Sequence, residues 1–291
     1  MTISFIGAGK VGTSLGLYFQ ENNFNILGFY NRSFVSAQNP SDLTKTTTFK
    51  HLSQALGADI IFITVNDDAI KEVALDLFKL STPYDNKIFV HTSGAHTASE
   101  LEILKNETSS IISMHPIQAF TDIGHSVAQL KNTVFSLEGD PKGITALGNI
   151  LSQCGNQYFT LTKEQKPLYH ASACVVSNYL VTLLDYGFSM LEHIGLPKNL
   201  AQESFFPLIE ATLNNVKTHG PTDALTGPIS RGDITTIQKH LESFKVNSFA
   251  HTELYKALGR STLGLAEKGK LKKKDIALEI SQLLEAYNNE K

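Results

Sequence analysis

The sequence lacks most features that mark secreted, membrane-spanning or nucleic-acid-binding proteins. Its 291 residues include two cysteines, Cys154 and Cys174, which give neither a disulfide framework nor the spacing of a metal site. No run of about 18 apolar residues is present, and no charged and apolar leader precedes the first expected strand. The formal net charge of -3 supplies no basic field for nucleic acid or an anionic membrane. We therefore expect a cytoplasmic protein that binds neither.

The sequence does contain enough apolar residues for two domains. Its hydrophobic content is 42%, and domains commonly hold about 100 to 200 residues. As far as residue 162, short apolar strands alternate with helical patterns, which is typical of a doubly wound parallel sheet. From residue 163 onward no convincing strand remains, and the apolar spacing is helical. We predict an α/β domain over residues 1–162 and an all-helical domain over residues 163–291.

A glycine-rich turn follows the first expected strand and precedes a helix. Gly7, Gly9 and Gly12 have the G-x-G-x-x-G spacing, in which the glycines allow a tight turn, close approach of a pyrophosphate and close helix packing. The helix N-terminus offers free N–H groups to phosphates. The spacing alone is weak evidence, and an ordinary strand-turn-helix is the alternative, but the context favours a Rossmann-type dinucleotide site. Its predicted contacts are Gly7, Ala8, Gly9, Lys10, Val11 and Gly12.

The residues after the second expected strand indicate which dinucleotide binds. In NAD-specific domains a carboxylate about 20 residues after the glycines bonds the ribose hydroxyls. This chain instead has Asn31, Arg32 and Ser33 there. A guanidinium with hydrogen-bond donors suits a 2′-phosphate, so we predict NADP(H) as the cofactor. The alternative is that Arg32 is an ordinary exposed loop residue.

Three polar, turn-rich segments, residues 64–68, 91–96 and 114–118, follow later expected strands. Ligands bind at the carboxyl ends of strands in such sheets, so we expect these segments to form a wall over the nicotinamide. The histidines among them are not spaced as metal ligands, and no metal site is expected. The predicted cofactor contacts are Val65, Asn66 and Thr92, and the predicted substrate contacts are Ser93 and His115.

Polar residues recur every four positions on the first long helix of the second domain. Lys166, His170, Cys174 and Asn178 would share one face of that helix. Reduction of a carbonyl leaves an alkoxide that needs a proton, and histidine suits that role near neutral pH. We predict His170 as the proton donor, Lys166 as the competing catalytic residue and Asn178 as a substrate contact. A histidine that only bonds its helical neighbours is the alternative.

A single arginine lies in the turn-rich segment 222–233. Arg231 could make a bidentate contact with a substrate carboxylate, or it could bond helix carbonyls or Asp233. We predict the substrate contact.

These motifs together resemble a known family. Gly7 to Gly12, Asn31-Arg32-Ser33, His115-Pro116 with Phe120, Tyr169-His170-Ala171 with Ser177-Asn178-Tyr179, and residues 224–228 with 231–233 are similar to bacterial Rossmann-like proteins carrying the domain-of-unknown-function 2520 helical module. The resemblance spans nearly the whole chain. Some members act as alternative ketopantoate reductases, and the layout also resembles pyrroline-carboxylate reductases. The resemblance implies an NADPH-dependent oxidoreductase that forms a homodimer through its helical domain.

The chain departs from the ordinary ketopantoate reductases that it resembles. If Asn178 matches their second substrate-site asparagine, His170 stands where they have a catalytic lysine and Cys174 where they have the first asparagine. Either His170 or Lys166 would then supply the proton. The leading hypothesis is reduction of a small 2-oxo acid, with 2-dehydropantoate as the best single substrate. The alternatives are an imine or other oxo-acid reductase, a non-catalytic NADP sensor and a deazaflavin-linked reductase.

Overall fold

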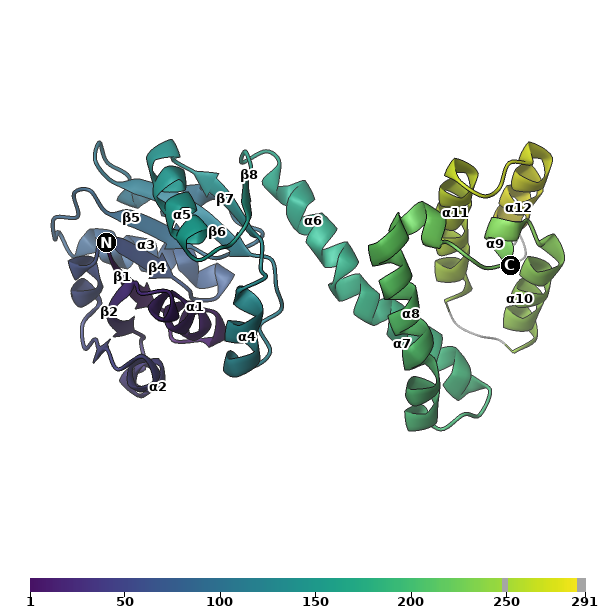
Figure 1. The fold of residues 1–291 in the computed structure, drawn as a ribbon, viewed down its shortest axis with the longest axis horizontal. Coiled ribbons are helices and arrows are strands. Elements are labelled where there is room, and N and C mark those ends of the chain that lie inside the picture. The colour runs from purple at the N-terminus through teal and green to yellow at the C-terminus, as the bar shows by residue number, and fades with distance from the viewer. Residues whose placement is uncertain (248–250, 287–291) are drawn as a thin grey trace. The chain divides into compact units, whose positions relative to one another are not determined.

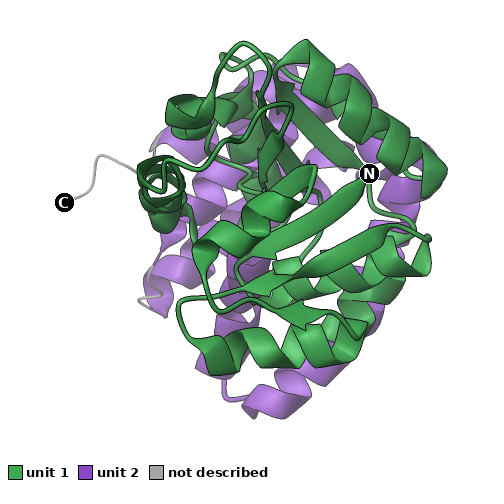
Figure 2. Cartoon of the chain, turned by 90° about the vertical axis from the view of Figure 1, so that its left-hand side faces the viewer, with its two compact units in different colours: residues 1–178 green, residues 179–291 purple. Residues whose placement is uncertain are grey.

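The computed structural model describes residues 1–247 and 251–286. By compactness the chain divides into two units, residues 1–178 and 179–291 (Figure 2). Helix α6, Lys166–Val176, belongs to the first unit because its first turn is hydrogen-bonded to the sheet. The functional boundary predicted at residues 162 and 163 remains a prediction.

The first unit is built on an eight-stranded sheet with the order β3-β2-β1-β4-β5-β6-β7-β8 (Figure 1). Neighbouring strands are parallel except β6 and β7, which are antiparallel. The predicted fold class is therefore confirmed. The strands are β1 Thr2–Ile6, β2 Asn25–Tyr30, β3 Thr47–Thr48, β4 Ile60–Ile63, β5 Ile88–His91, β6 Ser110–Pro116, β7 Phe135–Gly139 and β8 Tyr158–Thr160.

Helices cover both faces of this sheet, so its central strands are apolar on both sides. All four residues of β4 are buried, and Phe5 stacks on Phe29 and Phe62 with ring centroids 5.0 and 5.2 Å away. One face packs against α1 Lys10–Glu21, α2 Phe34–Thr44, α4 Ile123–Leu130 and α5 Pro141–Gln153. The other packs against η1 Leu52–Gly57, α3 Ile70–Lys79 and η3 Ala98–Leu104, with η2 Asp67–Ala69 leading into α3.

The strand order reverses beside β1. The chain passes from β1 to β2 and β3 on one side, and then returns to β4 on the other side of β1. The connections after β1 and β4 therefore leave the sheet in opposite directions, which opens a crevice at their carboxyl ends. This crevice positions the site described below.

The second unit is helical. Its core is formed by apolar side chains of α9 to α12, among them Ile237, Leu241, Ile280 and Leu284. Gly220, with φ 77° and ψ 165°, interrupts α8 directly before Pro221. The helices are α7 Asn178–His193, α8 Lys198–Ala224, α9 Pro228–Arg231, α10 Ile234–Val246, α11 Thr252–Lys268 and α12 Lys274–Ala286.

One helical stretch of the described residues, Lys166–His193, is long and apolar enough to cross a membrane by length and composition. An 18-residue window in it has a mean hydropathy of 1.3, although only 6% of that window is buried. This finding is compatible with the absence of an unbroken apolar run in the sequence. A window can reach this mean hydropathy even when polar residues interrupt its apolar ones. One such helix is weak evidence for a membrane span, since helices of soluble proteins meet the same criteria.

Candidate functional site

The glycine turn after β1 contains two positions, Gly7 and Gly12, at which a Cβ atom would collide with the backbone or with Thr64. Gly7 has φ +114°, and a Cβ atom there would lie 2.6 Å from the Thr64 carbonyl oxygen. A Cβ atom on Gly12 would lie 2.5 Å from the Gly7 carbonyl oxygen, whereas one on Gly9 would meet no atom within 4 Å. Gly7 and Gly12 therefore permit close packing, while Gly9 leaves open space at the N-terminus of α1. This arrangement fits a bound pyrophosphate.

A cavity of about 370 Å³ extends from this turn along the carboxyl ends of β1, β2 and β4. Among the predicted cofactor residues it is lined by Gly7, Ala8, Gly9, Asn31, Arg32, Val65 and Asn66. Ser33 is not among the lining residues, because its hydroxyl accepts a hydrogen bond from the Ser36 N–H and caps α2. Glu72 and Asp76 of α3, which no sequence motif indicated, also line the cavity and bring negative charge to it.

A second cavity, of about 440 Å³, shares Gly9, Thr64, Val65 and Asn66 with the first. The structure brings together here five further predicted residues, Lys10, Val11, Thr92, Ser93 and His115. Their roles as ligand contacts remain predictions. Three other lining residues, Asp67, Gly94 and Phe120, were not assigned contacts from the sequence. Asp67 could have been identified, because it is a charged residue in the polar segment 64–68 that follows β4.

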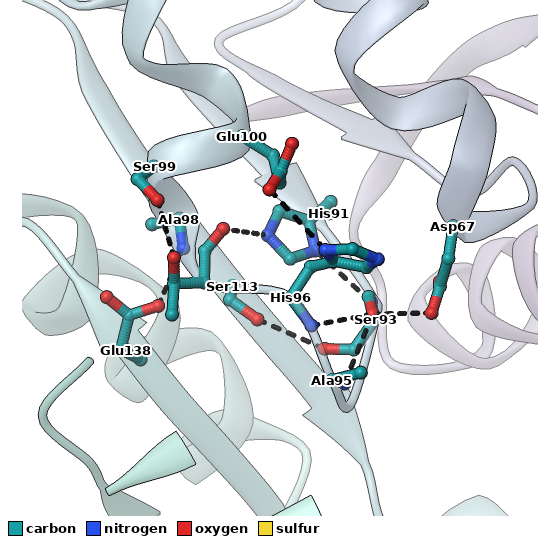
Figure 3. A network of polar contacts seen from close by, with 11 residues as sticks. Asp67, His91, Ser93, Ala95, His96, Ala98, Ser99, Glu100, Ser113 and Glu138 are labelled. Carbon is teal, nitrogen blue, oxygen red and sulfur yellow. Dashed lines mark hydrogen bonds and ion pairs between the residues drawn. The ribbon is translucent and has the colours of Figure 1, made fainter. Parts of the chain in front are cut away.

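A hydrogen-bond network fixes the loop between β5 and η3 (Figure 3). The Ser93 hydroxyl donates to Asp67 Oδ2 at 2.8 Å and accepts from the Ala95 and His96 N–H groups. Nearby, the buried carboxylate of Glu138 accepts from the Ala98 N–H at 2.6 Å. The predicted substrate residue Ser93 is therefore held in place by its own loop and by Asp67.

His91 is fully buried inside this network. Its Nδ1 accepts from the Ser93 N–H at 3.2 Å, so its Nε2 carries the proton and donates to the Thr97 carbonyl oxygen at 3.0 Å. Burial lowers the pKa of His91 to about 4. The imidazole is therefore neutral at neutral pH and holds the loop through both nitrogens.

Lys166 is also fully buried. Its Nζ donates to the Ser113 hydroxyl on β6 at 2.6 Å, and that hydroxyl donates to the Ser93 carbonyl oxygen at 3.2 Å. Burial lowers the pKa of Lys166 to about 8, while the negative charges of Glu138 and Asp67 act in the opposite direction. The sequence predicted a competing catalytic role for this residue; the structure shows a buried cation tied to β6.

Two imidazole rings border Gly94. A Cβ atom on Gly94 would lie 2.8 Å from His170 Cδ2 and 2.9 Å from His115 Nε2. The other ring nitrogen of His115, Nδ1, is 2.6 Å from the Tyr169 hydroxyl. Burial lowers the pKa of His115 to about 4, with the charge of Lys166 acting in the same direction. The two predicted residues His115 and His170 thus lie together, although their helix and strand are far apart in sequence.

The remaining predicted residues lie elsewhere. Asn178 is exposed at the start of α7, beyond the break at Ser177, and lines neither cavity. Arg231 is exposed at the end of α9 in the second unit, so its contact with a substrate stays a prediction. Within the described ranges, no group of three or more His, Cys, Asp or Glu side chains could hold a metal ion.

Two family models match the chain. Residues 1–116 match the Rossmann-like domain, and residues 133–262 match the family described as domain of unknown function 2520. No curated protein matches the chain by sequence. Among solved structures, a protein from Thermotoga maritima is similar with a TM-score of 0.74 and 25% sequence identity, over 91% of this chain and 98% of that one.

Two reductases of known structure are similar in fold. A pyrroline carboxylate reductase from Plasmodium falciparum with NADP bound has a TM-score of 0.56 and 16% identity, over 97% of this chain and 98% of that one. An imine reductase from Pseudomonas sp. has a TM-score of 0.61 and 16% identity, over 97% and 99% of the two chains. At these identities the similarity shows a shared fold.

Proposed function

Because the chain belongs to the Rossmann-like proteins that carry the domain of unknown function 2520, we propose that it is an NADP(H)-dependent reductase. The observation that carries this proposal is the pair of adjoining cavities that share the open position at Gly9. The first cavity is lined by the glycine turn, Asn31 and Arg32, which suit a dinucleotide. The second is lined by the titratable side chains of Asp67 and His115. The similar fold of reductases, one with NADP bound, supports it.

The glycine turn and the β2 strand end would hold the cofactor. The free N–H groups at the start of α1 would bond the pyrophosphate, and Arg32 with Asn31 would contact the 2′-phosphate. Val65, Asn66 and Thr92 would border the nicotinamide, which when bound supplies hydride chemistry. The carboxylates of Glu72 and Asp76 line the same cavity, so the contribution of Arg32 has to exceed their repulsion of a phosphate.

We propose a small 2-oxo acid as substrate, and 2-dehydropantoate, which the family resemblance implies, is the first one to test. His170 would donate the proton, since it is half-buried and borders Gly94 beside the second cavity. Lys166 is tied to Ser113 and contributes through its charge. Ser93 and His115 would contact the substrate, and Asn178 and Arg231 would orient its carboxylate, Arg231 from the same chain or from a partner copy.

An imine is the second candidate substrate, favoured by the carboxylate of Asp67. This side chain lines the second cavity, and a negative charge there stabilises a protonated C=N group while it repels the carboxylate of an oxo acid. The fold is shared with an imine reductase. An imine or other oxo acid therefore belongs in the same substrate screen.

We also propose a cytoplasmic homodimer formed through the helical domain. Leu168 and Val176 of α6 are 78% and 73% exposed, and Val181 of α7 is 68% exposed. Apolar side chains on such surfaces commonly mark an interface between proteins or with a membrane. Light scattering should give twice the monomer mass, and the protein should remain in the supernatant when liposomes are sedimented. A monomer that pellets with liposomes would favour the membrane.

The central experiment is a screen of NADPH oxidation with purified protein. Ketopantoate, other 2-oxo acids and cyclic imines are supplied at equal concentration, and absorbance at 340 nm is followed. We expect turnover with one of these classes, and faster turnover with NADPH than with NADH. Tight NADPH binding without turnover of any of them would instead favour a non-catalytic NADP sensor.

A further inference from the structure

Two polar pairs fasten the first turn of α6 to β6. Lys166 and Tyr169, three residues apart, lie on one face of the helix, and Ser113 and His115, two residues apart, lie on one face of the strand. Lys166 donates to Ser113 at 2.6 Å, and the Tyr169 hydroxyl lies 2.6 Å from His115 Nδ1. The Lys166–Ser113 pair is enclosed within the protein. The Tyr169–His115 pair reaches the second cavity, because His115 lines that cavity.

The proton between Tyr169 and His115 can be assigned from chemistry. A phenol O–H is a more acidic donor than a neutral imidazole N–H, and an unprotonated imidazole nitrogen is a stronger acceptor than a phenol oxygen. Burial raises the pKa of Tyr169, with the Ser136 hydroxyl acting in the opposite direction, and burial lowers the pKa of His115 to about 4. Both side chains are therefore neutral at neutral pH, and the tyrosine donates to Nδ1.

The opposite nitrogen of His115 then carries the ring proton. Nε2 and the neighbouring Cε1 would each lie 2.9 Å from a Cβ on Gly94, so this end of the ring lies against a residue that lines the second cavity. Tyr169 also meets the His115 ring edge-on with centroids 5.8 Å apart, and Phe159 meets Tyr169 in the same manner. Resting on the proposed reductase function, we infer that Tyr169 is a positioning residue that holds His115 as its Nε2–H tautomer, so that His115 presents an N–H donor to the reducible bond of the substrate.

The charged and titratable groups around His115 favour this neutral donor. Beside burial, Lys166 and His170 on α6 lower its pKa, and Asp67, from the turn after β4, acts to raise it. A neutral imidazole donates a hydrogen bond without giving up its proton. His170 can then remain the proton donor, and the two imidazoles beside Gly94 have different roles.

The tautomer is measured directly by nitrogen-15 NMR of the protein without any ligand. Protonated and unprotonated ring nitrogens have well-separated shifts, and the His115→Gln variant identifies the signal among the ten histidines. We expect Nε2–H in the natural protein and a mixture of tautomers in Tyr169→Phe. An Nδ1–H tautomer in the natural protein overturns the inference, as does an unchanged tautomer in Tyr169→Phe. The first result does not depend on Tyr169→Phe, so misfolding of that variant leaves the inference testable.

Turnover provides the second readout. Tyr169→Phe should lower kcat about 10-fold or more with a smaller change in KM, because the donor acts on charge that develops in the transition state. Tyr18→Phe is the matched control: it also removes a buried hydroxyl, bonded to Asn156 at 2.7 Å, but lies outside both cavities. Equal kcat in Tyr169→Phe and the natural protein would contradict the inference. If no substrate is reduced at all, the proposed function fails, while the NMR result still decides the tautomer.

Discussion

The buried histidine His91 should make the first unit sensitive to acid. In the native protein the pKa of His91 lies at about 4, chiefly because burial disfavours its charged form, whereas the ordinary value is 6.5. The unfolded chain therefore binds a proton between pH 6.5 and 4 that the native chain excludes. Stability is lost where the unfolded state binds more protons, so His91 lowers the stability of the native state as the pH falls through this range.

The magnitude follows from the two pKa values. A pKa difference between 6.5 and about 4 corresponds to at most about 3.5 kcal/mol, at ~1.4 kcal/mol for each pH unit. Most of this, about 2 kcal/mol, is lost between pH 7 and pH 4.5. Glutamine in place of His91 keeps a donor and an acceptor but cannot titrate, so the variant His91→Gln should lack this part of the acid sensitivity.

The assay compares urea unfolding of the natural protein and His91→Gln at pH 7, 6, 5 and 4.5. The chain has no tryptophan, so circular dichroism at 222 nm reports unfolding, and hydrogen exchange of peptides from β5 reports the first unit separately. All other histidines are common to both proteins and cancel in the difference. Free energies of unfolding that fall in parallel for the two proteins would refute a buried, neutral His91.

Three further predictions concern the cofactor site and the buried lysine. Gly9→Ala should weaken NADPH binding at least 10-fold in a fluorescence titration without loss of stability. Gly7→Ala, whose Cβ would meet Thr64, should instead lower the free energy of unfolding by about 1 to 3 kcal/mol in urea. Unchanged NADPH affinity in Gly9→Ala would contradict binding of the pyrophosphate at the glycine turn. Arg32→Ala should raise the KM for NADPH about 10-fold more than that for NADH, and equal increases would remove the 2′-phosphate contact. Burial lowers the pKa of Lys166 from 10.5 to about 8, so between these pH values the unfolded chain binds one proton more than the native chain, and stability should rise with pH. Lys166→Met should abolish this rise in stability. If the rise persists in the variant, another group causes it.

The sheet was predictable because its central strands are apolar over their full length. Ile60 to Ile63 and Ile88 to Val90 are buried on both faces, and a strand with no polar face indicates a parallel sheet with helices on both sides. The glycine turn was equally visible, because its spacing follows a strand and precedes a helix. Local sequence therefore determines these features.

The elements that were missed depend on tertiary contacts. Strand β3 has two residues and exists through its pairing with β2, where Gly28 lies against Thr47. The short helix α4 was not predicted; the Asp122 side chain caps it by accepting from the His125 N–H. Residues 98–104 form a 3₁₀ helix. Over so few residues, the spacing of apolar side chains does not distinguish a short α-helix, a 3₁₀ helix and a short strand.

The helical stripe from Lys166 to Asn178 was predicted only in part. A spacing of four does place Lys166 and His170 together, but the spacing cannot say which strand they meet. The helix also ends at Val176, and Ser177, with φ -118° and ψ -72°, separates it from α7. The face does not continue to Asn178, which is exposed. The tyrosine that contacts His115 lies between the predicted residues, and only the fold reveals its partner.

The buried charge of Lys166 acts on two histidines of the proposed site, His91 and His115. Lys166 is the first residue of α6, where the positive end of the helix dipole adds to the cost of its burial. Its charge acts to lower the pKa of both His91 and His115. Burial is the main cause of both shifts, and this one cation adds to it, so the imidazole that holds the Ser93 loop and the imidazole that faces the second cavity are both neutral. A neutral His115 can donate a hydrogen bond but is a poor source of a proton at neutral pH, so the proton in the proposed reaction has to come from another group. Among the candidates on α6, His170 borders the same glycine and, unlike Lys166, is not engaged with β6.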